Sequence, residues 1–182
     1  MSKWEQISKL EEWLYLGGIP SMSEKQAGEL IERYNFDIII TINDREVNWK
    51  LPKNIAHFIL LIRDSLHESI FPYLDFVSEL LKVTCEKGKK VFIHCRYGIS
   101  RSVSLVAAYY LRYGKSQSVK DALSYIKEKR PYIKPWKNFI DDLIKFSQTC
   151  SLHSKFHLEE PLKINKKENQ KISRKRESIK KN

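Results

Sequence analysis

A thiol and a guanidinium lie six residues apart in the segment His94–Ser102, which reads His-Cys-Arg-Tyr-Gly-Ile-Ser-Arg-Ser. A loop of this length can curl so that successive backbone N–H groups point to one centre, and the N-terminus of a following helix adds partial positive charge there. Such a cradle binds a phosphate dianion and favours the thiolate of Cys95. Arg101 offers a planar fork for two phosphate oxygens. We therefore expect Cys95 to attack phosphorus while Arg101 holds the phosphate.

The other residues of this segment are expected to shape the phosphate loop. Gly98 lacks a Cβ, so the backbone there can adopt positive φ and approach the ligand closely. Arg96 and Tyr97 are expected to line the mouth of the site. His94 is predicted to support the loop by hydrogen bonding rather than to transfer protons. The predicted phosphate-binding residues are Arg96, Tyr97, Gly98, Ile99, Ser100 and Arg101.

Strand and helix signals alternate on both sides of the loop, a pattern typical of a sheet covered by helices. Ser21-Met22-Ser23-Glu24 suggests a capping box at the start of an amphipathic helix. The apolar residues after Ser102 occur nearly all round the helical period and predict a helix in the centre of the domain. Strands are expected at 13–16, 36–42, 56–62 and 91–94. The strands at 36–42 and 56–62 are apolar runs that we expect to be buried on both faces of the sheet. Helices are expected at 24–34, 70–88, 103–114, 118–130 and 135–146.

Length and composition point to one globular domain. The chain has 182 residues, of which 42% are hydrophobic and 30% charged, and its apolar runs are far shorter than a membrane-spanning helix requires. The predicted fold class is therefore α/β, a single domain with a central mixed, largely parallel sheet flanked by helices. Three cysteines, an odd and sparse count, favour a reducing compartment, so we expect a cytoplasmic protein that can also be nuclear.

The excess of positive charge gathers at the C-terminal end. From Pro161 to Asn182 the sequence has nine Lys and Arg against two Glu and no aromatic residue. Such a stretch cannot bury enough surface to offset its ordering entropy. The sequence predicts a catalytic domain at 1–157 and a basic, disordered tail at 158–182. The alternatives for the tail are nuclear import through an importin, weak contact with nucleic acid or anionic lipid, and a merely solvated end.

At these residues the chain resembles the dual-specificity branch of the cysteine-dependent protein tyrosine phosphatases, whose signature is His-Cys, five residues, Arg, then Ser or Thr. The resemblance runs from about Trp13 to about Phe146 and implies the fold of that superfamily. Asp64, 31 residues before Cys95, lies where the family has its general acid. Ser102 matches the hydroxyl that eases departure of the thiolate. Asn43 matches a residue at the end of the second strand and is expected to support a loop.

The resemblance implies a two-step reaction without metal or cofactor. Cys95 attacks phosphorus, Asp64 protonates the leaving oxygen, and water then hydrolyses the phosphocysteine with Asp64 as base. Asp44 and Asp75 compete for the acid role, but Asp75 falls inside a predicted helix and Asp44 on a different loop. The implied substrates are phosphotyrosine and phosphoserine or phosphothreonine in proteins. Activity should be highest at mildly acidic pH.

Three other functions stay open beside this one. Phosphoinositide-directed relatives usually carry more basic residues in the loop, where this chain adds only Arg96, and RNA 5′-phosphatases usually have Asn-Arg-Thr in place of Ser100-Arg101-Ser102. A non-catalytic module that only binds phosphoproteins is the third alternative.

The other two cysteines suggest weaker candidates. A zinc site at Cys150, His153 and His157 has suitable spacing, but no fourth ligand is placed nearby. Cys85 is expected to be a core cysteine, with a protective disulfide to Cys95 as the alternative.

The chain departs from the family pattern in its closing segment. The usual Pro-Asn-x-Gly-Phe-x-x-Gln-Leu reads Pro-Trp-Lys-Asn-Phe-Ile-Asp-Asp-Leu from Pro135 to Leu143. Trp136, Asn138 and Asp142 thus replace the Asn, the Gly and the Gln. In the family this segment holds the loop that carries the general acid, here the loop of Asp64, which we call the acid loop. We therefore expect the departures to change the rate or the substrate preference and to leave the nucleophile and the phosphate loop intact.

Overall fold

A computed structural model describes residues 7–18, 23–114 and 116–156 of the chain, with side chains up to residue 150. In these residues five strands form one sheet in the order β1-β2-β5-β3-β4. Neighbouring strands run parallel except for β1 and β2, which are antiparallel. The predicted α/β class with a mixed, largely parallel sheet is confirmed. The strands are β1 (Ser8–Lys9), β2 (Leu14–Gly18), β3 (Ile38–Asn43), β4 (Ala56–Leu61) and β5 (Val91–Cys95).

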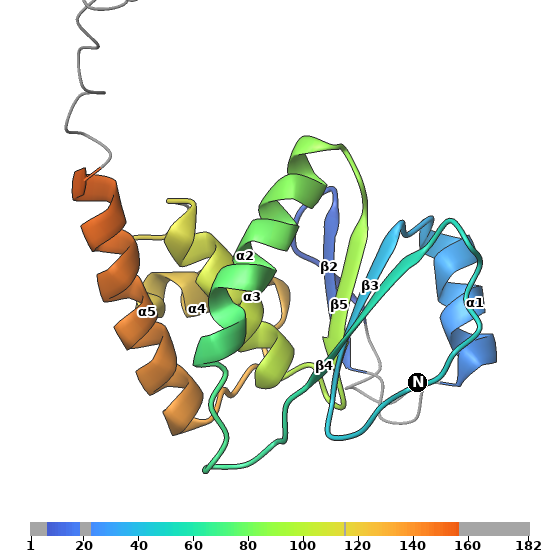
Figure 1. Cartoon of the computed structure of the whole chain (residues 1–182), viewed down its shortest axis with the longest axis horizontal. Helices are drawn as coiled ribbons and strands as arrows, with labels where there is room; N and C mark the ends of the chain where they lie inside the picture. The colour runs from blue at the N-terminus through green and yellow to red at the C-terminus, as the bar shows by residue number, and fades with distance from the viewer. Residues whose placement is uncertain (1–6, 19–22, 115, 157–182) are drawn as a thin grey trace, which may run out of the picture. The chain divides into compact units, whose positions relative to one another are not determined.

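Helices lie on both faces of this sheet, with α1 on one face and α2 and α3 on the other (Figure 1). They are α1 (Glu24–Tyr34), α2 (Phe71–Glu86), α3 (Arg101–Arg112), α4 (Val119–Lys129) and α5 (Lys137–Phe156). Side chains alternate between the two faces along each strand, as the pleat requires. On β5, Phe92 packs with Tyr15 and Ile31 on the α1 side, whereas Ile93 and Cys95 belong to the larger core beneath the other helices.

The helix α3 occupies the centre of that larger core. All but the last of its residues are buried, including its polar first turn of Arg101 and Ser102. Its neighbours in the fold are the helices α2 and α4 and the strands β5 and β2. A helix enclosed in this way has a fixed N-terminus, so the phosphate loop that precedes it is held at both ends, by β5 and by α3.

Two local predictions are corrected by the structure. The capping box of α1 is formed by Ser23 and Gln26, two residues further along than proposed: the Ser23 hydroxyl accepts from the Gln26 backbone N–H, and the Gln26 side chain accepts from the Ser23 N–H. Ser21 lies outside the described residues. The strand at 56–62 is not buried on both faces, because β4 is the edge of the sheet and only Leu60 within it is buried.

The contacts divide the chain into one compact unit, Met1–Cys150, and a second, Ser151–Asn182. Every described residue of the phosphate loop lies in the first. The predicted boundary after residue 157 stays a prediction, since residues 157–182 lie outside the described part. None of the helices in that part has the length and apolar character needed to cross a membrane.

Candidate active site

Cys95 ends β5 in the middle of the sheet and is buried, 3% exposed. Its Sγ accepts two hydrogen bonds of 3.3 Å, one from the backbone N–H of Gly98 and one from the hydroxyl of Ser102. The site thus lies at the carboxyl ends of parallel strands, where open α/β sheets bind their ligands. Two donors directed at one sulfur are the arrangement that a thiolate nucleophile and a thiolate leaving group both require.

The backbone carbonyl groups of the phosphate loop accept hydrogen bonds from residues outside the loop. Arg130, at the C-terminal end of α4, donates from Nε to the Gly98 carbonyl at 2.6 Å and from its NH2 atom to the Tyr97 carbonyl at 3.1 Å. The backbone N–H of Lys134 donates to the Ile99 carbonyl at 2.7 Å. Because the N–H of a trans peptide points away from its C=O, these contacts turn the amides of residues 98–100 towards the interior of the loop.

Gly98 is required by the close packing of the loop on β2. Its φ is +62°, and a Cβ built there would lie 2.3 Å from both the carbonyl carbon and the oxygen of Gly17. No L-residue fits beneath that backbone without moving it. The loop can therefore approach the sheet this closely only with glycine at this position, and the positive φ expected from the sequence is present. Its close approach to a ligand stays a prediction.

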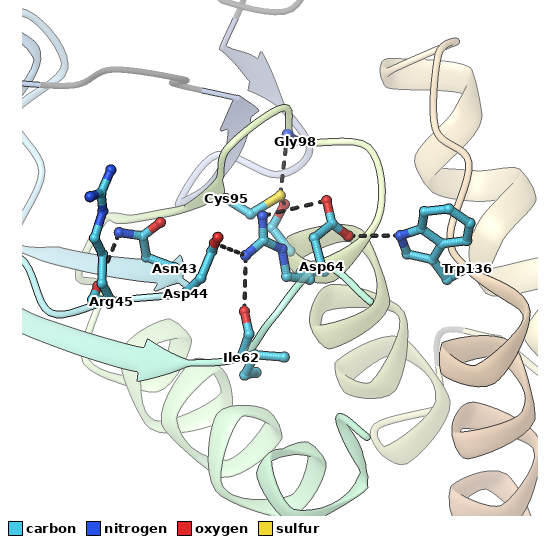
Figure 2. A network of polar contacts seen from close by, with 10 residues as sticks. Asn43, Asp44, Arg45, Ile62, Asp64, Cys95, Gly98 and Trp136 are labelled. Carbon is cyan, nitrogen blue, oxygen red and sulfur yellow. Dashed lines mark hydrogen bonds and ion pairs between the residues drawn. The ribbon is translucent and has the colours of Figure 1, made fainter. Parts of the chain in front are cut away.

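Arg101 connects the phosphate loop to two other loops. Its NH1 atom donates to Asp44 Oδ1 at 3.0 Å and to the Ile62 carbonyl at 2.9 Å, and its NH2 atom lies 3.5 Å from Asp64 Oδ2 (Figure 2). Its Nε is buried and has no hydrogen-bond partner among the described residues. The guanidinium is thus oriented through NH1 and, at longer range, NH2. The unpartnered Nε, together with the second N–H of NH2, is proposed to bind two oxygens of a phosphate.

The structure distinguishes Asp64 from its two competitors for the acid role: Asp75 lies on α2 and pairs with Arg112, whereas Asp44 pairs with Arg101. Burial acts to raise the pKa of Asp44, but its hydrogen bond and charge interaction with Arg101 outweigh burial and hold that pKa below the ordinary value. Asp44 therefore stays ionised at assay pH and suits the orientation of Arg101. Asp64 stands on the loop after β4, where its Oδ1 accepts from the indole N–H of Trp136 at 2.8 Å (Figure 2).

Separate replacement of the two aspartates is expected to distinguish their roles. Asp64→Asn should slow hydrolysis of a phosphothreonine peptide about 10²-fold, because an alkoxide leaves poorly without a proton donor. The same variant should affect p-nitrophenyl phosphate much less, since its leaving group is stable as an anion. Asp44→Asn should slow both substrates to a similar extent because it acts through Arg101. Steady-state kcat for both substrates measures the difference, and a larger effect of Asp44→Asn on the phosphothreonine peptide alone would transfer the acid role to Asp44.

His94 points to the other face of β5, and its side chain contacts β3. Its Nε2 lies 2.9 Å from the hydroxyl of Thr41, which also bonds Nε2 of His57 at 2.9 Å, and its ring stacks on Phe92. Burial first, and then the neighbouring His57, lower the pKa of His94 to about 3. A histidine that stays neutral through the working pH range is not suited to transfer protons, and its support of the loop by hydrogen bonding stays a prediction.

The remaining predicted residues take different places. Arg96 is exposed and its guanidinium lies over the ring of Tyr97, 5.3 Å from the centroid, while Ile99 is partly buried in the loop. The Ser100 hydroxyl faces the closing segment and accepts from the Trp136 backbone N–H at 3.2 Å. Asn43 donates to the Arg45 carbonyl and so closes the loop after β3 that carries Asp44. Its contact braces that loop and not the phosphate loop.

The departures in the closing segment all lie against the acid loop. Asn138 donates from Nδ2 to the carbonyls of Ser65 and Glu68. Oδ2 of Asp142, a buried residue, accepts from the Ser69 hydroxyl and from the backbone N–H groups of Ile70 and Phe71, and so caps the N-terminus of α2 from another helix. Together with Trp136, these residues connect the acid loop to the beginning of α5.

Sequence reasoning did not identify Arg130 or Thr41 as parts of the site. Arg130 precedes Pro131 in a basic stretch that reads as an ordinary exposed helix end, and Thr41 lies in an apolar strand. A buried charged side chain can be recognised only from the contacts that it makes in the fold.

The two other cysteines lie outside the site: Cys85 is at the C-terminal end of α2 near Tyr109, and Cys150 is on α5. The described residues contain no cluster of His, Cys, Asp or Glu suited to a metal, and His157 lies beyond them.

The sheet order, the phosphate loop between β5 and α3, and the cysteine within it define a cysteine-dependent phosphatase of the protein tyrosine phosphatase superfamily. Residues 14–149 match the family model described as the dual specificity phosphatase catalytic domain. The chain belongs to the dual specificity phosphatase family, so the resemblance seen in the sequence is confirmed.

Several known proteins are similar to this chain. Protein 123R of Invertebrate iridescent virus 6, named as a tyrosine phosphatase, is 35% identical over 141 residues, which cover 78% of this chain and 92% of the viral protein. Tyrosine-protein phosphatase vhp-1 of Caenorhabditis elegans is 36% identical, over 73% of this chain but only 20% of its own length. The crystal structure of the human tyrosine phosphatase-like serine/threonine/tyrosine-interacting protein has a TM-score of 0.70 at 23% identity, covering 79% of this chain and 96% of that one.

Proposed function

We propose that this chain hydrolyses phosphotyrosine and phosphoserine or phosphothreonine monoesters in proteins through a phosphocysteine intermediate. The observation that carries the proposal is the convergence of three groups. The Gly98 N–H and the Ser102 hydroxyl donate to the sulfur of Cys95. Arg101, at the start of α3, and Asp64, on the loop after β4, lie 3.5 Å apart. These are the groups that transfer of a phosphoryl group to sulfur and then to water requires.

In the first step the thiolate of Cys95 attacks phosphorus, and the S–P bond forms as the bond to the ester oxygen breaks. Asp64 in its protonated form gives its proton to that departing oxygen. Arg101 and the loop amides neutralise the charge that spreads over the three equatorial oxygens.

In the second step a water molecule attacks phosphorus while the Asp64 carboxylate takes one of its protons. The S–P bond breaks, inorganic phosphate forms and sulfur leaves as a thiolate, an outcome that the hydrogen bond from Ser102 favours. The sequence of steps regenerates both the thiolate and the protonated acid.

A panel of substrates tests the proposal. Phosphate release is measured side by side from phosphotyrosine and phosphothreonine peptides, phosphoinositides in detergent micelles and a 5′-triphosphate RNA, in the presence of a metal chelator. We expect kcat/KM to be highest for the two peptides. A lipid or RNA substrate turned over tenfold faster than either peptide would reassign the enzyme to that substrate class, and binding of peptides without turnover would favour the non-catalytic module.

The tail and the location in the cell stay predictions. Residues 158–182 lie outside the described part, and the proposed cytoplasmic and nuclear location depends on their charge and on the cysteine count alone. Removal of residues 158–182 is proposed to leave turnover of a short peptide unchanged, since every described group of the site lies before residue 143.

A further inference from the structure

The side chain of Trp136 makes a hydrogen bond to the acid loop. Its indole Nε1 donates to Asp64 Oδ1 at 2.8 Å, whereas the residue is 42% exposed. The backbone N–H of Trp136 is bound separately, to the Ser100 hydroxyl, so the chain is held there whatever the side chain. The indole N–H therefore acts on one carboxyl group.

The two oxygens of Asp64 have different surroundings. Oδ1 accepts from the indole N–H of Trp136 at 2.8 Å, the shorter of the two hydrogen bonds that the carboxyl group accepts from described residues. Oδ2 accepts from NH2 of Arg101 at 3.5 Å. The indole therefore fixes which of the two oxygens faces the guanidinium that is proposed to hold the phosphate.

The acid loop itself does not depend on the indole. Asn138 holds the carbonyls of Ser65 and Glu68, and Asp142 holds the chain at Ser69, Ile70 and Phe71. Loss of the indole N–H should leave these contacts in place. What it removes is the rotational restraint on the Asp64 side chain.

We infer that Trp136 is the positioning residue of the general acid: its indole N–H holds Oδ1 and so fixes the Asp64 carboxyl with Oδ2 towards Arg101. This inference rests on the proposed phosphatase function and adds to it the residue through which the acid is oriented. Trp136 acts through Asp64 and need not touch the phosphate.

The test is Trp136→Phe, which keeps an aromatic ring and removes only the donor. We expect kcat for a phosphothreonine peptide to fall about tenfold, a part of the whole contribution of a general acid. For p-nitrophenyl phosphate kcat should change less than about twofold, because that leaving group needs little protonation. Across a series of aryl and alkyl phosphates, log kcat should therefore decline more steeply with the pKa of the leaving group than in the unaltered enzyme, while KM stays the same. Trp13→Phe, the same change at a tryptophan that packs on Tyr109, is the matched control and should leave the slope unchanged.

A double-mutant cycle shows whether the effect passes through Asp64. In the Asp64→Asn background, Trp136→Phe should have no further effect on any substrate. An equal fall for all leaving groups, an additional fall in the Asp64→Asn background, or a change confined to KM would overturn the inference. Failure of the proposed function gives a different result, namely that no phosphate ester is turned over by the unaltered chain.

Discussion

Cys95→Ser is expected to lower turnover of every phosphate ester by about 10⁴-fold or more, the scale seen when a covalent nucleophile is removed. A serine hydroxyl is a poor nucleophile unless a base takes its proton. The nearest histidine, His94, points to the opposite face of β5 and is bound to Thr41, so it cannot serve as that base. The donors from Gly98 and Ser102 remain, and the variant should still bind phosphate.

The chain supplies its own matched controls for this experiment. Cys85→Ser and Cys150→Ser make the same change at thiols on α2 and α5, away from the phosphate loop, and should retain turnover within about twofold. Phosphate release and peptide binding by calorimetry are measured for all three variants. Turnover that survives Cys95→Ser would rule out the phosphocysteine intermediate, whereas binding without turnover in the unaltered chain would identify a recognition module.

Arg101→Lys is expected to reduce kcat about 10³-fold, although it keeps the positive charge. An ammonium can replace the ion pair to Asp44, but it has no second edge for two phosphate oxygens. The lost fork therefore affects the transition state, in which the charge on those oxygens is greatest. Inhibition by orthovanadate, which imitates that state, should weaken by a similar factor.

Arg112→Lys provides the comparison for Arg101→Lys. Arg112 lies at the other end of α3 and pairs with Asp75 and Glu79 at the surface, so turnover and vanadate inhibition should be unaffected there. A circular dichroism melt of both variants checks that the fold persists. Retention of full activity by Arg101→Lys would show that charge alone suffices and would remove the bidentate contact from the mechanism.

Much of the fold could be predicted because its signals are local. The apolar run before Cys95 and the enclosed helix after Ser102 predict a strand, a loop and a buried helix in that order, and the structure has β5, the phosphate loop and α3 there. Gly98 was assigned from its missing Cβ, and the 2.3 Å approach to Gly17 supplies the reason. The two-residue strand β1 was missed, since its only evidence is its pairing with β2.

The parts that could not be predicted depend on partners far apart in the sequence. The loss of the family's Asn, Gly and Gln could be read as weaker bracing of the acid loop. In the structure, Trp136, Asn138 and Asp142 instead supply hydrogen bonds to that loop across about 70 residues of chain. The length of a side chain and the direction of its donor decide such contacts, and neither is visible before the helices are placed. The same is true of Arg130, whose burial alone distinguishes it from a surface cation.

The attachment of residues 64–71 to the start of α5 has a consequence for the timing of catalysis. Enzymes that carry their acid on a mobile lid must wait for closure in each cycle, and that motion often limits their rate. Here the carboxyl is held by a hydrogen bond from a residue at the start of a helix that packs in the core. We therefore expect the chemical events at phosphorus, and not closure of a lid, to limit the rate of turnover.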